Sequence, residues 1–178
     1  MLTLSKPPPR ESRRPPPVRS DSPVRNAALL AKVDFLLRAG RAREAVDAVG
    51  LAYLLCPWMA NALAVCHLRT GNTVRALRLL RHIATDDTGR HRPDVPTVFK
   101  TNLAAALFIA GDEDGFLRTL DEIGDESHPA VRRLRAAVAR WTASPPAWER
   151  LLRGFGIRPD RVSVLDGPVG ELTAEDHP

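Results

Sequence analysis

The sequence is poor in aromatic side chains and in cysteine. Phe, Trp and Tyr together make up only 5% of its 178 residues, and Cys56 and Cys66 are its two cysteines. Two cysteines cannot form the disulfide framework that stabilises small secreted proteins. A core with few aromatic rings must be filled by Leu, Ala and Val, and small side chains allow helices to pack closely. The composition therefore indicates an all-α protein in a reducing environment.

The sequence also lacks a long apolar run. Its most apolar stretch, residues 51–65, is interrupted by Pro57 and Asn61 and is shorter than the roughly 20 residues that span a bilayer. The first residues lead directly into prolines and contain no apolar signal-peptide core. These features together predict a cytoplasmic protein.

Motifs for catalysis and for cofactor binding are missing as well. The sequence contains no GxxxxGK[ST] phosphate loop, no GxGxxG, no GxSxG and no HExxH. Acidic residues 112–114 resemble a calcium loop, but Ala110 stands where its first ligand should be, and carboxylates at a helix start explain them better. Cys56, Cys66 and His67 fit buried packing better than a metal site. We therefore expect no enzymatic activity, no cofactor and no metal.

Charge and proline are distributed unevenly. The formal net charge is +5, and residues 1–25 carry six basic and two acidic side chains together with seven of the sixteen prolines. Such a segment buries too little apolar surface to fold, so it is predicted to be a disordered arm. Its positive charge makes accessory nucleic-acid binding the alternative function. Residues 155–178 carry two basic and five acidic side chains and are predicted to be an irregular acidic tail.

Between these segments the apolar residues follow a helical period. Asn26 is the predicted N-cap of a first helix that ends at Gly40, and a second helix is expected to continue to Pro57. The same unit of helix, glycine and helix recurs around Gly71 and around Gly111. This recurring pattern therefore predicts three consecutive helical hairpins.

Residues 26–154 form the predicted folded domain. Residues 85–96 are an expected loop that separates the second hairpin from the third. Pro129 is expected to open a further helix, since proline is favourable in a first helical turn. With a short helix at residues 147–152, it would cover the apolar end of the last hairpin.

The hairpins resemble the tetratricopeptide repeat, a helix-turn-helix unit of about 34 residues. That motif has a large and a small residue side by side in its first helix, a glycine at the turn and a small residue five positions later. The matching positions are Gly40, Ala45 and Pro57 in the first copy, Leu63, Ala64, Gly71 and Ala76 in the second, and Leu103, Ala104 and Gly111 in the third, where Phe116 replaces the small residue. The resemblance covers about residues 26–128 and implies an all-α, helical-hairpin repeat solenoid with a C-terminal capping helix pair. Because Lys32 and Val33 replace the large–small pair in the first copy and the glycines are unequally spaced, the repeats are degenerate.

The resemblance also implies a binding face. In that family the first helix of each repeat lines a concave groove through its second, fifth, ninth and twelfth positions. Carried over to this sequence, these positions include Asp34, Asn61 and Thr101 but are otherwise apolar. The implied groove residues that would contact a partner are Leu30, Leu37, Trp58, Val65, Leu68, Val98 and Phe108. The basic residues of a carboxylate clamp are absent from the fifth and ninth positions.

Two interpretations of this apolar groove remain open. It could bind a peptide or helix of another protein, which would make the chain an adaptor or a chaperone-like interaction module. It could instead be covered internally, by the capping helix or by the C-terminal tail, where residues 162–165 are the candidate plug. The sequence does not identify the partner.

Overall fold

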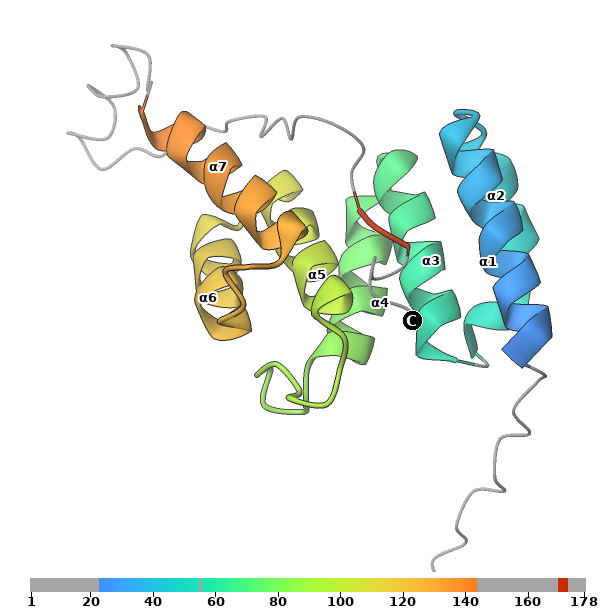
Figure 1. Cartoon of the computed structure of the whole chain (residues 1–178), viewed down its shortest axis with the longest axis horizontal. Coiled ribbons are helices and arrows are strands. Elements are labelled where there is room, and N and C mark those ends of the chain that lie inside the picture. Colours follow the sequence, from blue (N-terminus) through green and yellow to red (C-terminus); the bar gives the residue numbers. More distant parts are fainter. Residues whose placement is uncertain (1–22, 55, 144–169, 173–178) are drawn as a thin grey trace, which may run out of the picture.

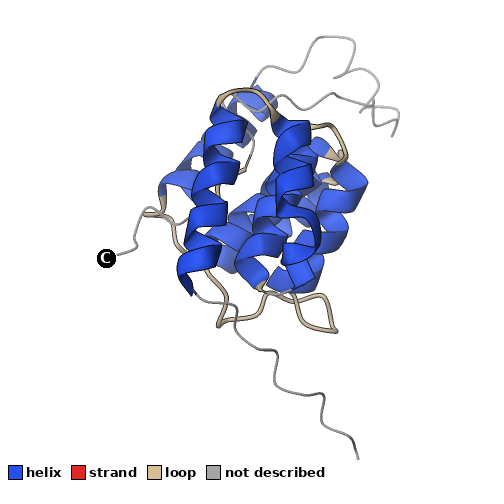
Figure 2. Ribbon diagram, turned by 90° about the vertical axis from the view of Figure 1, so that its right-hand side faces the viewer, coloured by secondary structure: helices blue, strands red, loops and turns tan. Residues whose placement is uncertain are grey.

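The fold is known from a computed structural model that describes residues 23–54, 56–143 and 170–172. The described residues form seven α-helices and one 3-10 helix, and their one β-type contact is an isolated bridge between Thr85 and His91. The all-α prediction is confirmed (Figures 1 and 2). In chain order the elements are α1 (Pro23–Arg38), α2 (Ala42–Val49), η1 (Gly50–Leu54), α3 (Pro57–Arg69), α4 (Thr73–Ala84), α5 (Thr97–Ile109), α6 (Glu113–Ile123) and α7 (Pro129–Ala143).

The same turn joins α1 to α2, α3 to α4 and α5 to α6. Its glycine has a positive φ in all three places, 72° at Gly40, 76° at Gly71 and 75° at Gly111. In the first turn the Gly40 N–H donates to the carbonyl of Leu37 and the next N–H reaches back to Leu36, and the other two turns repeat both bonds. This is the Schellman arrangement, which satisfies the last carbonyls of a helix and needs a residue without a Cβ at the left-handed position. Each glycine therefore reverses the chain and produces a helical hairpin.

The hairpins stand side by side in a row (Figure 1). The first helices of the hairpins contact one another, α1 with α3 and α3 with α5, and α7 packs against α5. Each second helix (α2, α4 and α6) packs against the first helix of its own hairpin. In addition, α2 contacts α3, and α4 contacts α5. One layer is thus formed by α1, α3, α5 and α7, and the other by α2, α4 and α6.

Two apolar clusters hold these layers together. One lies among α1, α2 and α3, and the other extends from α3 through α6 to Leu134 of α7. Ala45 and Ala76, the small residues five positions after the first two turn glycines, have no exposed surface. Close packing of this kind leaves little room for a larger side chain.

Two predicted helix limits are wrong. The first helix begins at Pro23, not at Asn26, because proline suits a first helical turn; the Asn26 amide instead donates to the sulfur of Cys56 at 3.8 Å. The second helix ends at Val49, well before Pro57. Gly50 has φ 50° and ψ −126°, which no α-helical residue adopts, and the chain continues as the 3-10 helix η1 from Gly50 onward.

Other predicted limits are confirmed. No described helix spans residues 85–96, and α7 begins at Pro129. The arm was predicted at residues 1–25; residues 23–25 belong to α1, and residues 1–22 lie outside the described residues. The short helix predicted at residues 147–152 and the candidate plug at residues 162–165 also lie outside them. Among the described helices, none combines the length and the apolar character that crossing a membrane would need.

Candidate functional site

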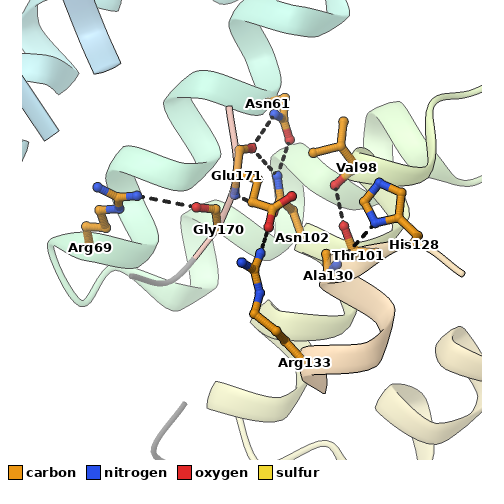
Figure 3. A network of polar contacts seen from close by, with 10 residues as sticks. All are labelled: Asn61, Arg69, Val98, Thr101, Asn102, His128, Ala130, Arg133, Gly170 and Glu171. Carbon is orange, nitrogen blue, oxygen red and sulfur yellow. Dashed lines mark hydrogen bonds and ion pairs between the residues drawn. The ribbon is translucent and has the colours of Figure 1, made fainter. Parts of the chain in front are cut away.

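A short piece of the C-terminal tail lies against the layer of first helices. Residues 170–172, drawn in red in Figure 1, run beside α3. Their hydrogen-bond partners come from α3 and α5, and an ion pair joins them to α7 (Figure 3). Because these partners are distant in the sequence, only the tertiary fold brings them together.

Two buried asparagines form the centre of the site. Asn61 of α3 has no exposed surface and Asn102 of α5 is 2% exposed. The Asn102 Nδ2 donates to the Asn61 Oδ1 at 2.8 Å, so the two amides hold each other in place. We refer to Asn61 and Asn102 as the asparagine pair.

The asparagine pair binds the main chain of Glu171. The Glu171 N–H donates to the Asn102 Oδ1 at 2.9 Å, and its carbonyl accepts from the Asn102 Nδ2 at 2.7 Å. One side-chain amide therefore pairs with both main-chain groups of one residue, as a neighbouring β-strand would. The same carbonyl also accepts from the Asn61 Nδ2 at 3.1 Å. Since only an amide oxygen can accept, the Glu171 N–H fixes the orientation of the Asn102 side chain.

Burial makes these hydrogen bonds important. A buried polar group that loses its partner costs about 1–3 kcal/mol, whereas an exposed one returns to water. Without residues 170–172, the Asn102 Oδ1 and one Nδ2 hydrogen of each amide would lose the main-chain partners just described. With residues 170–172 in place, these amide groups are covered and are satisfied by the main chain of the segment.

Two arginine side chains also contact the segment, one at Gly170 and one at Glu171. Arg69 of α3 donates from Nη2 to the carbonyl of Gly170 at 3.3 Å. Arg133 of α7 forms an ion pair with the Glu171 carboxylate (Figure 3). The Arg133 side chain is 63% exposed and that of Glu171 25%, so solvent weakens this attraction. The ion pair therefore adds preference for an acidic residue more than it adds stability.

The two ends of the segment fit the surface differently. Leu172 is 7% exposed and joins the apolar cluster of α1, α2 and α3. Gly170 lies above Val65, and a Cβ added to it would stand 2.9 Å from the Val65 Cγ2. Its φ of 80° is also one that L side chains rarely adopt. The position is thus restricted to glycine both by space and by conformation.

The groove residues implied by the resemblance are divided between the two apolar clusters. Leu30, Leu37 and Val65 belong to the cluster of α1–α3, while Trp58, Leu68, Val98 and Phe108 belong to the other. Leu30 and Trp58 are half-buried and the other five are buried. Of these seven residues, Val65 lies directly beneath the tail segment, because a Cβ added at Gly170 would stand 2.9 Å from its Cγ2.

Phe108 does not stand open on a groove surface. It is 5% exposed, and its ring centroid lies 4.9 Å from that of Phe116, in the second helix of the same hairpin. The Trp58 ring meets Phe99 edge-on at the same centroid distance. The short turn at Gly111 brings Phe108 and Phe116 together, so Phe108 contributes to packing inside the hairpin.

Sequence reasoning missed four contributors to the site. Asn102, Arg69, Arg133 and the segment 170–172 were not predicted, although Asn61 was placed on the correct face. A weak signal existed for the asparagine pair, because each amide is followed directly by a run of at least five apolar residues in its helix. Nothing in the local sequence of residues 170–172 indicates that they pack against α3.

The remaining candidates for chemistry have structural roles. Burial raises the pKa of the Cys66 thiol to about 11, so the thiol stays protonated and packs as a small apolar group. The Asp112 carboxylate accepts from the Gly115 N–H at 2.9 Å and caps α6. Among the described residues, no group of three His, Cys, Asp or Glu side chains could hold a metal ion.

Among the described residues, the arrangement binds a main-chain segment through two amide side chains, two arginines and an apolar cluster. Its parts come from α3, α5 and α7, three helices of one layer. Compared with protein-family models, with curated proteins and with solved structures, the chain gives no match.

Proposed function

We propose that this chain is a non-enzymatic, cytoplasmic interaction module that binds an extended peptide of another protein, as an adaptor or a chaperone-like protein does. One observation carries the proposal: the asparagine pair holds both main-chain groups of Glu171 in a buried position. Main-chain groups are common to all peptides. A site built for them can therefore accept a segment from another protein as well as one from its own chain.

The proposal includes the view that the hairpins are degenerate tetratricopeptide repeats. Its support is the repeated turn, in which Gly40, Gly71 and Gly111 have nearly the same φ and the same two hydrogen bonds. Further support comes from the buried small residues Ala45 and Ala76. In that family the first helices of the repeats line the groove, and Asn61 and Asn102 both lie on first helices.

Selection from a random heptapeptide library displayed on phage tests the proposal. The target is the full chain carrying Glu171→Pro and Leu172→Asp, which we call the released chain. The proline removes the N–H and the carboxylate at residue 171, and the aspartate disfavours burial at residue 172. We expect peptides to be enriched on the released chain.

A second target separates this face from the rest of the surface. It is the released chain with Asn102→Ala added, and enrichment on it should be lost. Asn72→Ala, at an exposed asparagine in the α3–α4 turn, is the matched control and should leave enrichment unchanged. Absence of any enriched peptide, or enrichment that is indifferent to Asn102→Ala, would contradict the proposed function.

A further inference from the structure

We propose that residues 170–172 are an internal competitor for the binding site, and that the partner peptide carries the same pattern: glycine, an acidic residue and an aliphatic residue. This inference rests on the proposed function and names its ligand. Each of the three positions meets a different part of the surface, and each contact restricts the residues that fit there.

The first position demands glycine. The carbonyl of Gly170 accepts from Arg69, while its Cα stands so close to Val65 that a Cβ would be 2.9 Å from Cγ2. Real Cβ atoms essentially never approach that closely. A competing peptide must therefore pass Val65 without a side chain.

The second position combines main-chain and charge recognition. The asparagine pair fixes the register of the peptide, because both its N–H and its C=O are bonded at this one residue. With the register fixed, the side chain at this position is directed to Arg133 of α7. A carboxylate is favoured there, and an ammonium group would be repelled.

The third position is surrounded by apolar side chains. Leu172 belongs to the cluster that includes Val33, Leu36 and Leu37 of α1. Burying an aliphatic side chain is favourable in proportion to the apolar surface that it removes from water. An aliphatic residue at the third position therefore supplies most of the buried apolar surface by which a competing peptide binds.

The contacts also explain why the internal segment can be displaced. Residues 170–172 are anchored by a few hydrogen bonds, one solvent-exposed ion pair and one buried side chain. Tethering through the same chain compensates for such a small contact by keeping the segment at an effective concentration of up to the order of millimolar. A peptide with the same pattern and additional contacts on either side competes for the same groups.

Fluorescence anisotropy with a labelled synthetic peptide tests the inference. The probe has the sequence of residues 167–174, Gly-Pro-Val-Gly-Glu-Leu-Thr-Ala. We expect it to bind the released chain at least tenfold more tightly than the unchanged chain, where residues 170–172 compete. Helical circular dichroism is checked first, and Gly170→Val serves as a second way to release the segment.

Changes in the probe test each position. Replacing its central glycine by alanine, or its leucine by aspartate, should weaken binding to the released chain at least tenfold. A probe with lysine in place of glutamate should bind weakly to the released chain and recover affinity when the chain also carries Arg133→Glu. Arg132→Glu, an exposed neighbour on α7 with the same charge change, is the matched control and should not recover it.

The possible failures are distinguishable. Equal binding of a scrambled probe, or no binding of the matched probe, would overturn the Gly–acidic–aliphatic pattern. If library peptides of another pattern then still bind through Asn102, the proposed function stands and only this inference fails. If no peptide of any sequence binds the released chain, both fail.

Discussion

At the scale of single residues, the site depends on two buried amides in an apolar surrounding. The groove implied by the sequence is mainly apolar, and an apolar surface alone does not fix the register of a bound segment. Asn61 and Asn102 do fix it, because their hydrogen bonds to the Glu171 main chain are directional and hold one residue of the segment in one register. Single residues also determine how well the core tolerates a change in side-chain volume or charge.

Ala76 tests the packing between helices. It has no exposed surface and lies in the larger apolar cluster. Ala76→Leu should lower the free energy of unfolding by about 1–3 kcal/mol, because the added atoms have no space. Urea denaturation followed by circular dichroism measures the change.

Arg78→Leu is the control for Ala76, since Arg78 lies on the same helix and is exposed. Surface substitutions of this kind change the free energy of unfolding by at most about 0.5 kcal/mol. Equal losses for the two variants would mean that the buried face of α4 is assigned incorrectly.

His67 predicts a pH dependence of stability. Burial lowers its pKa below the ordinary value, and the nearby charge of Arg75 lowers it further. The folded chain therefore binds fewer protons than the unfolded chain as the pH falls below about 6.5, the pKa of an unperturbed histidine. The free energy of unfolding should decrease from that pH down to the lowered pKa of the folded state.

His67→Leu removes this contribution and should flatten the fall of the melting temperature between pH 7 and pH 5. Part of the slope should remain, because burial also lowers the pKa of His91 against the opposing charge of Glu122. Melting curves at several pH values measure both effects. An unchanged slope in His67→Leu would contradict this account.

At the scale of the helical elements, the same turn occurs three times, but the helices that follow it are capped differently at their N-termini. Asp112 caps α6 through a hydrogen bond to the Gly115 N–H, while Asn72, at the equivalent position before α4, makes no side-chain cap bond. The helices are thus stabilised unequally at their N-termini even though the glycine turns that precede them match.

Removal of the cap should affect only one of these helices. Asp112→Ala should lower the free energy of unfolding by about 0.5–2 kcal/mol, the usual range for a lost N-cap. Asn72→Ala should cost clearly less, and Asp112→Asn, which keeps an acceptor, should retain most of the stability. Chemical denaturation of the three variants measures the differences, and equal effects of Asp112→Ala and Asn72→Ala would show that the cap contributes nothing.

At the scale of the whole molecule, a segment from the tail completes the surface formed by three helices. Leu172 adds to the apolar cluster of α1–α3, and Glu171 connects α3, α5 and α7. The helices nevertheless contact one another directly along the row. We therefore expect the segment to stabilise the fold without being needed to form it.

The released chain tests this view of the whole molecule. Loss of Leu172 burial should cost about 1.5–3 kcal/mol, which for a chain of this size lowers the melting temperature by several degrees. Unfolding should remain cooperative and the helical circular dichroism unchanged. A non-cooperative transition would mean that residues 170–172 belong to the core.

The sequence by itself determined the helical class and most of the helix positions. Turn glycines such as Gly71 and the start of α7 at Pro129 could be predicted because they depend on local backbone conformation. The early end of α2 at Gly50 could not, since a glycine within an apolar period is compatible with either a helix or its end.

Only the tertiary structure decided what the face of first helices contacts. Asn61, Asn102, Arg133 and Glu171 are separated by tens of residues, and local patterns carry no information on such distant pairs. An isolated asparagine in a helix has the same sequence signal whether it is satisfied by water or by a distant main chain. The site exists because folding removes both amides from water and leaves a main-chain segment as the partner that satisfies them.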